Sequence, residues 1–254
     1  MLAHEGILQT AERAPDRDAL RFLANGEDVT ERLTYAELAQ RGTDRAHWLC
    51  ALGLEGQPVA LVMEPGALFV ETLVACLLAG AVVSPLPVPK QALAVERVIG
   101  ALADLRPAAI LTTSALASLP ALATHPGIIH ALDEPWTAPR AILRRRGADE
   151  PAIVQYSSGS TAEPRGIVLT HANIAANLAM MNQVSGGEPG NVSVSWLPHS
   201  HDMGLFGTIL APLWHDSTAV LMPPAAFLRR PMRWLRAMSA HGGTHSTAPN
   251  FGYA

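Results

Sequence analysis

Short apolar runs alternate with helix-like segments along the first half of the chain, and this alternation limits the folds open to it. The apolar runs cover residues 58–63, 81–87 and 108–112, and helix-like segments at residues 67–80 and 94–105 separate them. Continuous apolar runs of this length are typical of strands that are buried on both faces of a parallel sheet. Strands that alternate with helices form right-handed βαβ units. The pattern therefore predicts an α/β fold with mostly parallel sheets flanked by helices.

The rest of the sequence extends this pattern and divides into two predicted lobes. Residues 33–54 form an amphipathic helix, in which Thr34 and Glu37 have the spacing of a capping box. Further elements are predicted as strands at residues 152–156, 167–169, 192–197 and 219–222 and as a helix opened by Thr170. We expect a first α/β lobe over residues 1–149 and the start of a second, truncated lobe over residues 150–254.

The charge balance and the cysteine content exclude several classes of protein. The chain has 18 basic and 22 acidic residues, so it lacks the basic surface that nucleic acid or an anionic membrane requires. The run from Arg144 to Arg146 is interpreted as a solvated face. The most apolar stretch, residues 72–83, is too short to span a bilayer, and no targeting segment is predicted. Cys50 and Cys76 are too few for a disulfide framework and are expected to be buried thiols, which fits a cytoplasmic location.

A small polar loop between two predicted strands is the sharpest chemical feature of the sequence. Residues 156–166 have the sequence YSSGSTAEPRG. Hydroxyl groups donate hydrogen bonds, glycine lets backbone amides approach a phosphate, and arginine adds positive charge. The spacing of a Walker A loop is absent, and Ser, Thr and Gly are also common in ordinary polar turns. The candidate phosphate-binding residues are Ser157, Ser158, Gly159, Ser160, Thr161, Arg165 and Gly166.

This loop resembles the signature phosphate loop of the adenylate-forming enzymes, the superfamily of acyl-CoA synthetases, peptide-synthetase adenylation domains and luciferases. Two positions depart from the family pattern, because Ala162 stands where glycine is usual and Arg165 where lysine is usual. Arginine keeps the positive charge, but its planar guanidinium group has a different hydrogen-bonding geometry from the ammonium group of lysine. The resemblance predicts the N-terminal part of the large domain of these enzymes, which is an α/β structure.

A second segment, residues 195–207, narrows the resemblance to one branch. Its sequence, SWLPHSHDMGLFG, is similar to that of fatty acyl-AMP ligases and of the related acyl-loading domains of polyketide and peptide synthetases. The segments LTYAEL from Leu33, FVETLVACLLAGAVVSPLPVP from Phe69 and the terminal THSTAPNFGYA agree with that branch in order. The resemblance implies that His201 lies near the α-phosphate and the carboxylate, where it stabilises developing charge. It also implies an acyl and adenylate pocket formed by Trp196, Asp202, Met203, His245, Pro249, Asn250 and Phe251.

The two histidines in this segment suggest a metal site as an alternative. His199, His201 and Asp202 are close in sequence, but Met203 and Gly204 follow where the di-zinc hydrolase pattern has further ligands. We therefore predict no metal at these residues. A buried, hydrogen-bonded histidine pair is the plainer interpretation.

The resemblance implies an enzyme that uses ATP and Mg²⁺ to convert a fatty acid to acyl-AMP and pyrophosphate. The acyl group would then pass to the phosphopantetheine thiol of an acyl carrier protein. Such catalysis consists mainly of holding two anions in line and neutralising charge as it builds. The family's later acidic motif, its ribose-binding aspartate and the lysine of its C-terminal lid have no counterpart here, and the single lysine, Lys90, lies far upstream of the phosphate loop. We expect an N-terminal portion without the lid domain, inactive in isolation.

Two other functions stay open on the sequence. The parent protein could be an acyl-CoA ligase or an amino-acid adenylation domain, which carry different residues at the HDMGL segment. Alternatively, the chain is a non-catalytic binding module that keeps the phosphate loop. Assays with CoA and with a holo carrier protein as acceptors would separate the two kinds of ligase.

Overall fold

The computed structural model describes residues 1–123, 125–137, 140–156 and 165–253. The chain forms two compact units. The first unit comprises Met1–Gln40, Pro65–Val70 and Ala172–Ala254, and the second comprises Arg41–Glu64 and Glu71–His171. Among the described residues, no helix is long and apolar enough to cross a membrane.

The second unit contains a six-stranded sheet with the order β6-β5-β3-β4-β7-β8. Its strands are β3 (Pro58–Val62), β4 (Val82–Leu86), β5 (Ala109–Thr112), β6 (Ile128–Ala131), β7 (Pro151–Tyr156) and β8 (Gly166–Thr170). All neighbouring pairs are parallel except β7 and β8, which are antiparallel. Every residue of β4 and β5 is buried, as the continuous apolar runs predict. The prediction of a mostly parallel α/β fold is confirmed.

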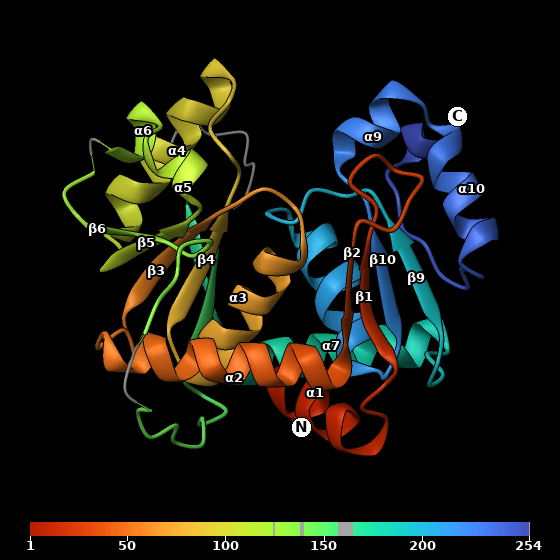
Figure 1. The fold of residues 1–254 in the computed structure, drawn as a ribbon, viewed down its shortest axis with the longest axis horizontal. Helices are drawn as coiled ribbons and strands as arrows, with labels where there is room; N and C mark the ends of the chain where they lie inside the picture. The colour runs from red at the N-terminus through yellow and green to blue at the C-terminus, as the bar shows by residue number, and fades with distance from the viewer. Residues whose placement is uncertain (124, 138–139, 157–164, 254) are drawn as a thin grey trace. The chain divides into compact units, whose positions relative to one another are not determined.

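Helices cover this sheet and connect its parallel strands (Figure 1). Those that lie wholly in the second unit are α4 (Ala92–Leu105), α5 (Ser114–Ala117) and α6 (Pro120–Ala123). Val98, Ala101 and Leu102 of α4 pack with Val62 and Ile110 in a buried apolar cluster. The βαβ arrangement therefore has the core that its sequence pattern requires.

Three further helices contain points at which the chain passes from one unit to the other. They are α2 (Tyr35–Ala51), α3 (Ala67–Ala79) and α7 (His171–Ser185). The predicted capping box opens α2, because the backbone N–H of Thr34 donates to Glu37 at 2.8 Å and the backbone N–H of Glu37 donates to the Thr34 hydroxyl at 3.2 Å.

The first unit contains a four-stranded sheet with the order β2-β1-β10-β9. Its strands are β1 (Asp18–Phe22), β2 (Glu31–Thr34), β9 (Val192–Ser195) and β10 (Thr218–Leu221). β1 pairs in parallel with β10, so that Leu20 lies opposite Ala219. Strands from the two ends of the chain thus complete one sheet, whereas β7 and β8 extend the other. The boundary expected between residues 149 and 150 falls inside the second unit, and the division into two lobes stays a prediction.

The other elements of the first unit surround its sheet. They are α1 (Ala3–Arg13), a π-helix (Met203–Leu210), α8 (Ala211–Trp214), α9 (Pro224–Arg229), α10 (Met232–Ala240) and a 3₁₀ helix (Asn250–Tyr253). Tyr35 is fully buried and its hydroxyl donates to the carbonyl of Ser217 at 2.8 Å. Asp216, also buried, accepts from Arg13 at 2.6 Å and forms an ion pair with Arg17. These contacts fix the turn from His215 to Ser217 against the start of the chain.

The arginine run of the second unit departs from the predicted solvated face. Arg146 is only 4% exposed, and its guanidinium donates to Glu55 at 3.0 Å. It lies against Gly80, where a Cβ atom would come within 2.1 Å of the guanidinium. Arg144 is more exposed and pairs with Glu55 and Glu150. The prediction is wrong for Arg146, because ion pairing with Glu55 allows this cation to be buried.

Candidate functional site

The candidate phosphate loop joins the antiparallel strands β7 and β8 of the second unit. Tyr156 and Gly166 are paired in the register of these strands and mark the two ends of the loop. Arg165 is exposed next to Gly166. Ser157, Ser158, Gly159, Ser160 and Thr161 lie outside the described residues. Their role in phosphate binding stays a prediction.

The base of the loop is held by Tyr156. Its hydroxyl donates to a carboxylate oxygen of Asp104 at 2.7 Å. Partial burial, together with this carboxylate, raises the pKa of Tyr156, so the phenol keeps its proton. A Cβ atom at position 166 would lie 2.9 Å from Val154 and 3.2 Å from the tyrosine ring. Close packing on Val154 and Tyr156 therefore favours glycine at position 166, a structural reason in addition to the predicted role in binding.

The HDMGL segment forms the start of the π-helix in the first unit. Asp202 caps this helix, because its carboxylate accepts from the backbone N–H of Met203 at 2.6 Å. The Nδ1 atom of His201 lies 2.6 Å from the same carboxylate, and both side chains are more than half exposed. A π-helix is rare and occurs most often at functional sites. Nδ1 of His201 faces this carboxylate, which leaves Nε2 as the ring nitrogen that can contact a ligand.

His199 differs from its neighbour His201 in burial and in its contacts. It is 4% exposed, and neither ring nitrogen has a hydrogen-bond partner among the residues that the structure describes. Its ring centroid lies 5.2 Å from that of Phe69. Burial lowers the pKa of His199 to about 4, so the imidazole is neutral near pH 7. The interpretation as a buried, hydrogen-bonded histidine pair is therefore wrong, since one ring is buried without a partner and the other is exposed.

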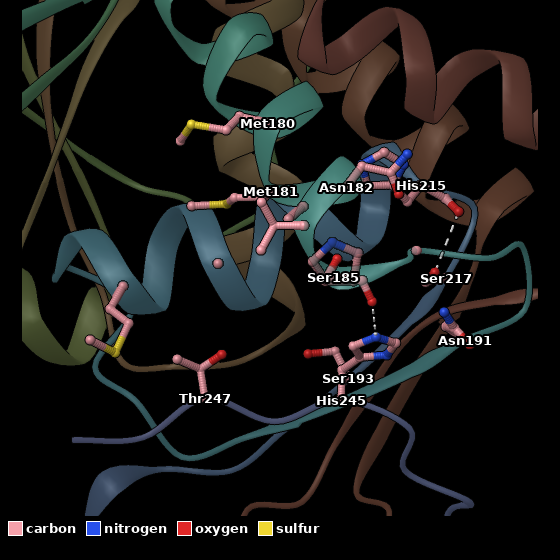
Figure 2. A pocket seen from close by; sticks show the side chains of 16 residues that line it. Met180, Met181, Asn182, Ser185, Asn191, Ser193, His215, Ser217, His245 and Thr247 are labelled. Atoms are coloured by element: carbon pink, nitrogen blue, oxygen red, sulfur yellow. Dashed lines mark hydrogen bonds between the residues drawn. The ribbon is translucent and has the colours of Figure 1, made fainter. Parts of the chain in front are cut away.

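A pocket of about 390 Å³ lies in the first unit between α7, the π-helix and the end of the sheet (Figure 2). One wall carries the apolar side chains of Met180, Met181 and Val184 from α7. The opposite wall includes the helix positions Met203, Gly207, Ala211 and Pro212. Polar side chains complete the lining at Asn182, Ser185, Asn191, Ser193, His215, Ser217, His245 and Thr247. A mostly apolar pocket with a few polar groups is typical of a small-molecule site.

His245 joins two sides of this pocket. Its Nε2 atom lies 3.0 Å from the carbonyl oxygen of Ser185, the last residue of α7. Figure 2 draws this contact as a dashed line. Its Nδ1 atom lies 2.8 Å from the hydroxyl of Thr244. Its backbone extends the sheet beyond β9, through hydrogen bonds with Val192 and Val194. A neutral ring with Nε2–H as the donor satisfies both contacts, so His245 is held rigidly at the pocket.

The predicted pocket residues are not all at this pocket. Met203 and His245 line it, whereas the described residues around it do not include the other five. Trp196 stacks on Phe227, with ring centroids 3.8 Å apart, and is 4% exposed in an aromatic cluster. Phe251 lies against Trp196 with centroids 5.8 Å apart. Pro249 and Asn250 form the turn at the start of the 3₁₀ helix, and Asp202 caps the π-helix.

Several lining residues were not predicted from the sequence. Met180, Met181 and Val184 belong to a helix whose apolar residues could equally have formed core. Met180 and Val184 are exposed and Met181 is half-buried, which distinguishes them from core residues. The end of their helix is joined to His245 through Ser185, a contact between positions 60 residues apart. His215 and Ser217 follow α8 and lie at the pocket because Tyr35 and Asp216 fix their turn.

The described residues contain no group of three or more His, Cys, Asp or Glu side chains arranged to hold a metal ion. Cys50 and Cys76 are free, the former partly and the latter fully buried.

Comparison with known proteins identifies relatives of the whole chain. Residues 7–251 match the family of AMP-binding enzymes. A long-chain-fatty-acid–AMP ligase of Mycobacterium bovis is 35% identical over 97% of this chain and 45% of its own length. A 4-hydroxyphenylalkanoate adenylyltransferase of Mycobacterium marinum is 36% identical over 96% of this chain and 42% of its own length.

Solved structures agree with these relatives. The fatty acid AMP ligase of Legionella pneumophila superimposes with a TM-score of 0.90 at 26% identity, over 99% of this chain and 45% of the ligase. A fatty acyl-adenylate ligase of the same organism, in complex with acyl adenylate and pyrophosphate, gives a TM-score of 0.88 at 26% identity, again over 99% of this chain and 45% of the ligase. The chain spans about half the length of the curated relatives it matches. It belongs to the AMP-binding, adenylate-forming enzyme family, and its resemblance to the fatty acyl-AMP ligases extends from one end of the described structure to the other.

Proposed function

We propose that the chain is the N-terminal portion of a fatty acyl-AMP ligase. The intact enzyme would join a fatty acid to the α-phosphate of ATP and release pyrophosphate. The observation that carries this proposal is the largely apolar pocket of about 390 Å³, which lies between α7, the π-helix of the HDMGL segment and His245. An acyl chain is an apolar ligand that such a pocket suits. Relatives named as long-chain-fatty-acid–AMP ligases support the same reaction.

The proposed roles of the polar residues follow from charge. Hydroxyl and amide groups of residues 157–161, with Arg165, would hold the phosphates of ATP. His201, balanced by Asp202 at 2.6 Å, would stabilise the negative charge that develops when the carboxylate attacks the α-phosphate. In this reaction a carboxylate oxygen forms a bond to phosphorus, and the bond to pyrophosphate breaks.

Mg²⁺ would enter with ATP rather than as a resident ion. The described residues offer no cluster of carboxylates or histidines that could hold it. Mg²⁺ is commonly bound through substrate phosphates with one or two carboxylates.

The acceptor of the acyl group is proposed to be the phosphopantetheine thiol of an acyl carrier protein. The thiolate would attack the acyl carbonyl of acyl-AMP and displace AMP. Comparing holo carrier protein with CoA as acceptors tests this assignment. Faster thioester formation with CoA would favour an acyl-CoA ligase instead.

The adenylation step is tested with the polypeptide that contains this chain and the remainder of the enzyme. Pyrophosphate release from ATP should require a medium or long fatty acid. Alanine at Ser157, Ser158 and Thr161 together should reduce kcat by about 10²-fold or more, as loss of charge-stabilising donors does. The exposed Ser239, replaced by alanine, serves as the control. Full activity of the triple variant would contradict the loop assignment.

His201→Ala should likewise reduce kcat with a smaller effect on KM, because the proposed interaction strengthens in the transition state. Residues 1–254 alone should show no turnover. Formation of acyl-AMP by this chain alone would contradict the expectation that it is inactive in isolation.

A further inference from the structure

Three residues spaced four apart form the helix wall of the pocket. Met203 and Gly207 belong to the π-helix, and Ala211 begins α8. All three line the pocket. Met203 has the largest side chain of the three, Ala211 has a single methyl group and Gly207 has no side chain. Position 207 therefore contributes the least volume to this wall.

The two glycines of the π-helix have opposite surroundings. A Cβ atom at Gly204 would lie 2.1 Å from the carbonyl oxygen of Pro198, a backbone atom that cannot move aside. A Cβ atom at Gly207 would meet no atom of the described residues within 4 Å. Packing thus requires glycine at 204 but leaves position 207 open to a side chain.

The helix itself gives no reason for glycine at position 207. Glycine is less favourable than every other residue except proline in a helix interior. Gly207 does not have the positive φ angle found at seven other glycines of the described chain. The open space next to it is part of the pocket, whose opposite wall carries Met180, Met181 and Val184.

We propose that Gly207 is a specificity-determining residue that sets the free cross-section of the pocket, and through it the length of the acyl chain that the protein accepts. This inference rests on the proposed function, in which the pocket holds the acyl chain. A side chain at position 207 would project into the pocket and remove space that long chains need, while short chains would still fit.

The test uses residues 1–254 and a series of saturated fatty acids from hexanoic to octadecanoic acid. Gly207→Ala, Gly207→Val and Gly207→Leu form a series of increasing volume. Ala176→Leu, on an exposed position of α7 that does not line the pocket, is the matched control for an added leucine. Binding is measured by isothermal titration calorimetry, and folding is checked by thermal unfolding.

Gly207→Leu should weaken binding of the longest acids by about tenfold or more, within the range for apolar contacts in a pocket. The affinity for the shortest acids should change by less than about twofold in the same variant. Gly207→Ala should weaken binding of the longest acids by an amount between those of the wild type and Gly207→Leu. Ala176→Leu should match the wild type at every length. The same order of chain lengths is expected for acyl-AMP formation by the longer polypeptide.

Two results would overturn this inference. The first is a loss of affinity in Gly207→Leu that has the same size for every fatty acid, in a series where Gly207→Ala unfolds at the wild-type temperature. A side chain at position 207 would then be tolerated by the fold without selecting for chain length. The second is unchanged affinity at all lengths in all three variants. Failure of the wild-type chain to bind any fatty acid would instead contradict the proposed acyl pocket itself, and the inference with it.

Discussion

The two units bury ionisable side chains in different ways. In the second unit, Arg45 and Glu71 are both below 10% exposed and form an ion pair, with Nη2 to Oε1 at 2.6 Å and Nε to Oε1 at 2.8 Å. In the first unit, His199 is buried as a neutral ring with no hydrogen-bond partner in the described part of the chain, and Asp216 pairs with two arginines that are partly exposed. A buried charge is tolerated when it is paired, and a buried group without a partner must stay neutral. The stability of the second unit should therefore depend on pairing, and that of the first unit on pH.

The largest effect is expected when the buried pair of the second unit is broken. Glu71→Ala leaves the Arg45 guanidinium buried without its counter-charge, which should lower the free energy of unfolding by about 3 to 5 kcal/mol. Denaturant unfolding followed by circular dichroism measures the change. The double variant Arg45→Leu with Glu71→Leu is the control, since replacing both charges with apolar side chains should cost less. A double variant as unstable as Glu71→Ala would show that the charge is not the cause.

His199 should make the stability of the first unit depend on pH. Its pKa is lowered from 6.5 to about 4 in the folded state, so protonation favours the unfolded chain. The contribution of this neutral ring to the free energy of unfolding is fully present above pH 6.5. It is lost as the pH falls toward 4, and the total loss is about 3 kcal/mol.

Unfolding free energies measured between pH 7 and pH 4 for the wild type and for His199→Leu test this prediction. The variant should lose less stability than the wild type across that interval. Equal losses in the two proteins would contradict it.

Asp216 should contribute less than Glu71, because the side chains of Arg13 and Arg17 are 65% and 33% exposed. Asp216→Asn keeps a residue that tolerates the backbone φ of 59° found here, and it removes only the charge. We expect a loss of about 1 to 2 kcal/mol in thermal or denaturant unfolding. The loss should shrink in high salt, and a loss as large as that of Glu71→Ala would remove the distinction between the two units.

The smallest effect is expected at an exposed pair of the second unit. Lys90 pairs with Glu64, and the two side chains are 65% and 51% exposed. Lys90→Gln should change the free energy of unfolding by less than about 1 kcal/mol, because water and salt screen exposed pairs. Activity of the intact enzyme should also be unchanged, since nothing assigns this lysine to the proposed reaction. A large loss of activity would identify a function for Lys90 that the proposed mechanism lacks.

The sheet of the second unit was largely predictable, whereas that of the first was not. β3, β4 and β5 are continuous apolar runs joined by helices, so their pattern is contained in neighbouring residues. β1 and β2 carry charged side chains that hide the strand pattern. Asp18 binds Arg21 of the same strand at 2.6 Å and Arg32 of the neighbouring strand at 2.5 Å. Pairing of β1 with β10 also joins positions about 200 residues apart, which no local pattern indicates.

The candidate site shows a similar division. Short motifs indicate that Met203 and His245 belong to one region, and both residues line the pocket. Trp196 was predicted with them, yet its ring stacks on Phe227 in the core. A large aromatic residue has the same sequence signature in a core as in a pocket. Gly207 carries no side chain, so its importance depends on the space around it and is invisible in the sequence.

The π-helix from Met203 to Leu210 also bears on how such a pocket can change during evolution. A π-turn differs from an α-turn by one additional residue, and its backbone hydrogen bonds connect residues five apart rather than four. Deletion of a single residue within this segment could restore an α-helix while leaving both ends in place. Every pocket-facing position after the deletion would then rotate relative to Met203. Substrate range in this protein could thus evolve by a change in helical register, as well as by exchange of the side chains that line the pocket.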